Sequence, residues 1–88
     1  MNRSSEEYYS SNALYSRPIP YHLLVSFVQH IGLYCHIKAI ARDVHTVSSE
    51  LDSLKNHAIY LSKYYHCRAH VNSLLDENKI STAHWYDE

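Results

Sequence analysis

The chain has few of the residues that make tight turns. Its 88 residues include one glycine, Gly32, and two prolines, Pro18 and Pro20. β-Hairpins rely on glycine and on Asn-Gly or Asp-Gly pairs, and the sequence contains neither pair. This scarcity argues against a sheet protein and favours helices.

Cysteine and a surplus of one charge are also lacking. Two cysteines do not make the disulfide framework of a small secreted domain. Eight basic side chains stand against nine acidic ones and form no run, so the basic stripe of a nucleic-acid-binding protein is missing. The first residues also lack the apolar stretch of a secretion signal. We therefore expect an intracellular protein that does not bind nucleic acid. The cytoplasm is the expected compartment, and the sequence points to no particular organelle.

Long hydrophobic runs are missing as well. The most apolar stretch, residues 23–35, is about 13 residues long and includes Ser26, Gln29 and His30. A transmembrane helix needs about 20 apolar residues. The stretch therefore predicts a buried amphipathic helix in preference to a membrane span.

The clearest pattern that is present is a series of apolar residues at alternating steps of four and three. We call this series the heptad seam; its members are Leu33, Ile37, Ile40, Val44, Val47, Leu51, Leu54, Ala58, Leu61 and Tyr65. Such spacing places all members along one edge of a helix, where a second helix can cover them. In a strand the members would fall on opposite faces. The sequence therefore predicts an all-α protein.

Two arrangements fit this pattern. A break before Ser49, which resembles a helix cap followed by acidic residues, gives two long helices over 20–46 and 49–76 in an antiparallel helical hairpin. The alternative is one continuous helix paired in a coiled coil. The wide apolar faces near both ends favour the hairpin.

The helical domain, residues 20–76, is flanked by two tails. Residues 1–19 form a polar tail rich in serine and tyrosine, and residues 77–88 form an aromatic and acidic tail. Trp85 and Tyr86 in the second tail either dock onto a partner, as aromatic anchors often do, or fold back onto the chain's own core.

A group of cysteines and histidines could bind zinc. His66 and His70 lie four residues apart, which can direct two imidazoles at one metal ion, and Cys67 lies between them. A hairpin would bring Cys35 and His36 opposite this group. The competing interpretation makes the cysteines small core residues and the histidines part of a solvated surface.

Nothing in the sequence indicates catalysis. There is no Gly-x-Ser-x-Gly, no glycine-rich phosphate loop and no His-Glu-x-x-His. Two packed helices also leave little room for a concave ligand site. We expect no enzymatic activity, no small-molecule substrate and no cofactor other than the zinc considered above.

The expected function is protein–protein interaction, as an adaptor or a small structural subunit, through self-association or a protein partner. The expected partner-binding residues are Leu33, Ile37, Ile40, Val44, Val47, Leu51, Leu54, Leu61, Tyr65, Trp85 and Tyr86. One alternative is a zinc-stabilised helical mini-domain. Another is a membrane-associated subunit of an organellar complex, with residues 23–41 in or on the bilayer.

Overall fold

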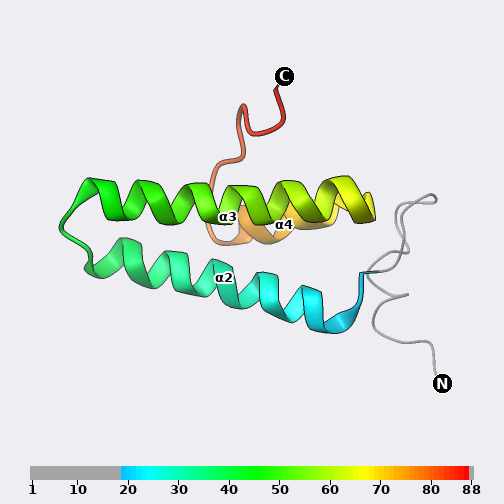
Figure 1. Ribbon diagram of the computed structural model, residues 1–88, viewed down its shortest axis with the longest axis horizontal. Coiled ribbons are helices and arrows are strands. Elements are labelled where there is room, and N and C mark those ends of the chain that lie inside the picture. The colour runs from blue at the N-terminus through cyan, green and yellow to red at the C-terminus, as the bar shows by residue number, and fades with distance from the viewer. Residues whose placement is uncertain (1–18, 88) are drawn as a thin grey trace.

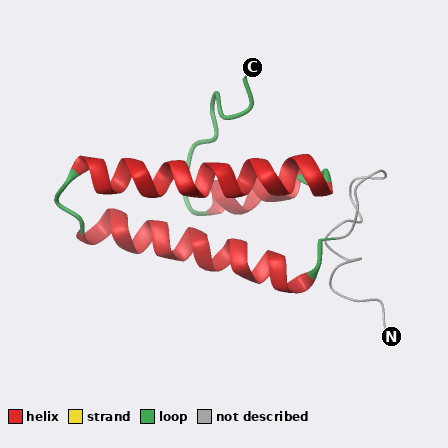
Figure 2. Cartoon of the chain, in the orientation of Figure 1, coloured by secondary structure: helices red, strands yellow, loops and turns green. Residues whose placement is uncertain are grey.

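A computed structural model describes residues 19–87, and all regular secondary structure in that range is helical. The helices are α2 (Tyr21–Ile40), α3 (Val44–Tyr65) and α4 (Arg68–Glu77). Helices α2 and α3 run antiparallel, while α4 packs on α3 and leads into an irregular C-terminal segment (Figures 1 and 2). The all-α prediction is confirmed. The predicted polar tail, apart from Ile19, lies outside the described residues.

The link between α2 and α3 is fixed by an aspartate cap. Asp43 Oδ1 accepts a hydrogen bond from the backbone N–H of His45 at 3.0 Å, and Oδ2 accepts one from the Thr46 hydroxyl at 2.8 Å. These bonds stabilise the charged carboxylate and lower its pKa. They also satisfy a backbone donor that the first turn of a helix would otherwise leave unpaired. Helix α3 therefore begins at Val44.

The predicted position of the break, next to Ser49, is wrong. Ser49 lies inside α3, and the link occupies residues 41–43. Asp and Ser are about equally good caps, so residue type alone did not separate the two candidates. The apolar step from Ile40 to Val44 continues the heptad spacing across the link, which concealed it.

A second break divides the region predicted as one helix over 49–76. His66 takes a left-handed conformation (φ 54°, ψ 41°) after the last residue of α3, and Cys67 precedes α4. This conformation at a helix end is usually supplied by glycine or asparagine, so a histidine gave no warning. The described chain has three helices, so neither the two-helix division nor the single continuous helix describes it.

One core joins the three helices. Helix α2 contributes four buried residues at steps of three, four and three: Leu24, Phe27, Ile31 and Tyr34. The other buried residues are Leu54, Ala58 and Leu61 of α3, Val71 and Leu75 of α4, and Ile19, Cys67 and Ile80 beside them. Helix α3 contacts both α2 and α4. It is therefore the helix on which the fold depends.

Candidate functional site

The exposed side of α2 carries large apolar residues among polar ones such as His22, Gln29 and His36. We call Tyr21, Val28, Leu33 and Ile40, together with Val44 at the start of α3, the outer surface of α2. Each is exposed over nearly half or more of its area, with 60% for Ile40 and 75% for Val44. Residues 21–37 contain no Asp, Glu, Lys or Arg. Single exposed apolar residues are ordinary, but a group of them is typical of an interaction site.

Helix α2 is apolar on more than the side that it buries. It has 20 residues, and its most apolar 18-residue window has a mean hydropathy of 1.3 and is 22% buried. By length and composition it is the helix of the described chain that could cross a membrane. The argument that the apolar stretch is too short therefore fails. Ser26, Gln29 and His30 interrupt the run of apolar residues without adding a charge.

The break at residues 41–43 divides the heptad seam into two parts with different surroundings. On α3, Leu54, Ala58 and Leu61 are fully buried, and the half-buried seam residues Val47, Leu51 and Tyr65 pack against the same core. On α2, Leu33 and Ile40 are exposed and Ile37 is half-buried.

The two parts consequently differ in what they can bind. The chain's own helices cover Leu54 and Leu61, so these predicted partner-binding residues have no area left for a partner. Leu33, Ile40 and Val44 keep theirs. Sequence spacing could not separate the two parts, because the seam runs through the link without a change of register.

The structure does not assemble the proposed zinc ligands. Cys35 is half-buried on α2, His36 is exposed on the same helix, and Cys67 is buried at the start of α4. The Cys67 thiol donates a hydrogen bond to the carbonyl oxygen of Leu61 at 3.4 Å, and burial raises its pKa to about 11.

Metal binding needs a deprotonated thiolate, which this environment opposes. His66 is exposed in the link and His70 is half-buried. Within residues 19–87 no group of three or more His, Cys, Asp or Glu side chains could hold a metal ion. The grouping expected from sequence is thus not formed there, because the helix pairing does not bring residues 35 and 36 to residues 66–70.

A histidine pair joins α2 to α3, and the sequence gave no sign of it. Nδ1 of His30 lies 2.9 Å from Nδ1 of His57. The ring of Phe27 meets the ring of His57 edge-on, with centroids 5.2 Å apart. Burial lowers the pKa of His57, and the neighbouring His30 lowers it further. The two rings meet because of the register in which α2 packs against α3, and the sequence does not indicate this register.

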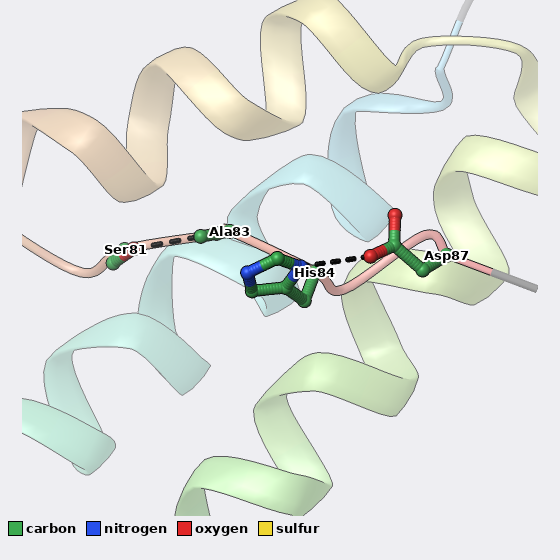
Figure 3. A network of polar contacts seen from close by, with 4 residues as sticks. All are labelled: Ser81, Ala83, His84 and Asp87. Atoms are coloured by element: carbon green, nitrogen blue, oxygen red, sulfur yellow. Dashed lines mark hydrogen bonds and ion pairs between the residues drawn. The ribbon is translucent and has the colours of Figure 1, made fainter.

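The C-terminal segment folds back onto the chain. Trp85 is half-buried against the core, and the Tyr86 hydroxyl donates a hydrogen bond to Asn72 Oδ1 at 2.9 Å. Beside them, His84 Nδ1 lies 2.8 Å from Asp87 Oδ2, and the Ala83 N–H donates to Ser81 Oγ at 3.3 Å (Figure 3). Trp85 therefore packs on the chain's own core, and docking of Trp85 and Tyr86 onto a partner stays a prediction.

Comparison with protein families, with characterised proteins and with solved structures found no match to this chain.

Proposed function

We propose that the protein is a non-enzymatic helical interaction module, an adaptor or small structural subunit, that docks an apolar helix of a partner protein onto the outer surface of α2. The observation that carries the proposal is the exposure of Leu33, Ile40 and Val44 on a folded chain whose remaining heptad-seam residues are buried or half-buried. A small domain buries only about 60% of its unfolded surface, so a partner is a common source of further stability at this size.

The spacing of the exposed residues favours a helix as the occupant. Leu33, Ile37 and Ile40 follow one another at steps of four and three along α2. Val44 lies beyond the link at the start of α3 and adds exposed apolar area without extending that series. This spacing suits knobs that insert between side chains of a facing helix. The absence of charge along residues 21–37 matches an apolar partner face, since a charged one would lose hydration without gaining an ion pair.

Substitutions in the buried part of the heptad seam would not test this proposal. Aspartate at Leu51 and Leu54 would abolish binding, but it would also place a charge in the core, since Leu54 is fully buried. Loss of binding in that variant would report unfolding. Substitutions on the outer surface of α2 avoid this problem.

The experiment uses the full chain, tagged and purified under native conditions with its partner. Leu33→Asp with Ile40→Asp is the test variant, and Ser53→Asp with Asn56→Asp is the control, because it adds the same charge at exposed positions of α3. Circular dichroism checks that both remain helical. We expect the partner to be lost with the test variant and retained with the control. Equal recovery with both would contradict the proposal.

A second candidate function rests on the length and hydropathy of α2. A 20-residue helix with a mean hydropathy of 1.3 and few buried residues also fits a membrane-associated subunit, with α2 in or on a bilayer. The hydrocarbon region of a bilayer would accept the exposed apolar residues in any spacing. The regular spacing of Leu33, Ile37 and Ile40 is specific to a facing helix, so we rank the membrane role second.

Vesicle flotation separates the two candidates. The full chain is mixed with uncharged phosphatidylcholine vesicles without detergent and centrifuged through a density gradient. Flotation that Leu33→Asp with Ile40→Asp abolishes would favour the membrane role. A chain that stays at the bottom, yet carries its partner through native purification, would favour the helix-docking role.

A further inference from the structure

A cavity of about 480 Å³ opens where α3, α4 and the C-terminal segment meet. Its walls are three basic side chains, two aromatic rings, one hydroxyl and one aliphatic side chain: Lys63, His66, Arg68, Trp85, Tyr86, Ser62 and Ile59. Sites for small molecules commonly measure about 300–1,000 Å³. The expectation of little room for such a site applied to two packed helices; the third helix and the returning C-terminal segment, which it did not include, line this cavity.

Contacts within the chain hold the aromatic wall in place. The guanidinium of Arg68 lies over the ring of Tyr86, 4.1 Å from its centroid. The Tyr86 hydroxyl is anchored by Asn72 and lies 3.4 Å from the hydroxyl of Ser62. The backbone N–H of Trp85 donates to the carbonyl oxygen of Thr82 at 3.1 Å, and the Trp85 side chain packs against the core. The rings are thus positioned before any ligand enters, which lowers the entropic cost of binding.

The charge of the cavity is positive. Within residues 19–87, none of its lining residues is acidic. The carboxylate of Asp87, which directly follows Tyr86, contacts His84 (Figure 3) and is not part of the cavity wall. Lys63 and Arg68 have no carboxylate partner within residues 19–87.

From this combination we propose that the cavity binds a small organic phosphate that carries an aromatic ring. The phosphate would lie between Lys63 and Arg68, since a guanidinium presents a planar pair of donors to phosphate oxygens and an ammonium adds a compact charge. The ring would stack on Trp85 or Tyr86, as nucleobases do on aromatic side chains. Nucleoside phosphates and simple aryl phosphates share this chemistry. The site lies on α3, α4 and the tail, apart from the outer surface of α2.

The protein carries its own reporter, because Trp85 is its only tryptophan. We would titrate the full chain with phenyl phosphate and with adenosine monophosphate, exciting Trp85 where neither probe absorbs. Phenol, adenosine and inorganic phosphate are the matched partial ligands. We expect saturable changes with the two complete probes that weaken as salt is added. Each partial ligand should bind at least about tenfold more weakly, because phenol and adenosine lose the charged contacts and inorganic phosphate loses the stacked ring.

Substitutions locate the phosphate. Lys63→Gln and Arg68→Gln should each weaken binding about tenfold, whereas Lys38→Gln, which removes the same charge from α2, should leave it unchanged. Lys63→Gln is decisive, because Arg68 also supports the ring of Tyr86. The proposal is overturned if neither complete probe saturates, if a partial ligand binds as tightly as a complete one, or if Lys63→Gln and Lys38→Gln bind alike.

Discussion

The Nδ1 atoms of His30 on α2 and His57 on α3 lie 2.9 Å apart. A neutral imidazole has one donor nitrogen and one acceptor nitrogen, while a protonated imidazole has two donors. One of these Nδ1 atoms must donate and the other accept, so at least one ring is neutral. The contact between the two helices therefore depends on pH.

Acidification should destabilise the fold. Burial, and then the nearby His30, lower the pKa of His57, and burial lowers the pKa of His70. The unfolded chain thus binds more protons than the folded chain between the lowered pKa values and the ordinary value near 6.5. Stability contributed by the neutral rings is full above about pH 6.5 and is lost as the pH falls through the lowered pKa values.

The urea midpoint measured from pH 7.5 to pH 5 checks this expectation. It should fall over that interval, and the fall should be smaller in His57→Asn than in the exposed control His22→Asn. The pKa of Asp43 is lowered from 3.8, so its effect on stability belongs to more acidic solutions. A midpoint that does not change from pH 7.5 to pH 5 would contradict the assignment.

Replacing the single glycine should stabilise the chain. Gly32 lies within α2 and is exposed, and an added Cβ would meet no atom within 4 Å. Glycine inside a helix costs about 0.8–1.0 kcal/mol relative to alanine. Gly32→Ala should therefore raise the free energy of unfolding by about that amount in urea titrations. A decrease in the free energy of unfolding would mean that other residues of the folded chain already pack closely against Gly32.

Two leucines of the heptad seam should respond very differently to the same substitution. Leu54→Ala empties a fully buried position and should cost about 2–5 kcal/mol. Leu33→Ala, at a position that is 49% exposed, should change the free energy of unfolding by about 0.5 kcal/mol or less. Chemical denaturation of both variants supplies the comparison. Similar losses would show that Leu33 is covered in the isolated chain.

The two thiols should differ in reactivity. Burial raises the pKa of Cys67 to about 11, so at pH 8 very little of it is the reactive thiolate. Cys35 is only half-buried. Alkylation at pH 8 followed by mass spectrometry should modify Cys35 first and Cys67 only on unfolding, with Cys35→Ser and Cys67→Ser assigning the sites. Equal rates for the two thiols in folded protein would contradict the placement of Cys67.

The sequence was sufficient for the fold class. Heptad spacing predicted helices across residues 20–76, but it assigned Leu54 and Leu61 to a partner, whereas they are buried in the chain's own core. It failed at the links, because Asp43 and Ser49 are comparable caps and His66 is not a residue that normally ends a helix. The link at residues 41–43 sets how α2 meets α3, and the link at residues 66–67 sets how α4 meets α3.

The candidate sites were less accessible to sequence reasoning. Leu33, Ile40 and Val44 were expected as binding residues, but so were Leu54 and Leu61, which the core uses. The His30–His57 contact depends on how α2 pairs with α3. No spacing pattern within either helix indicates that these two residues meet. The cavity beside Trp85 requires the return of the C-terminal segment onto α3 and α4, which spacing within one helix cannot reveal.

The most direct test of the account asks whether a partner covers the outer surface of α2. We would place a thiol there as Ile40→Cys in a Cys35→Ser background and measure its alkylation rate in the isolated chain and in the native complex. A matched protein with Ser53→Cys reports on the exposed side of α3. The account predicts that residue 40 reacts several-fold more slowly in the complex while residue 53 does not change. Equal rates for residue 40 in both states would contradict it.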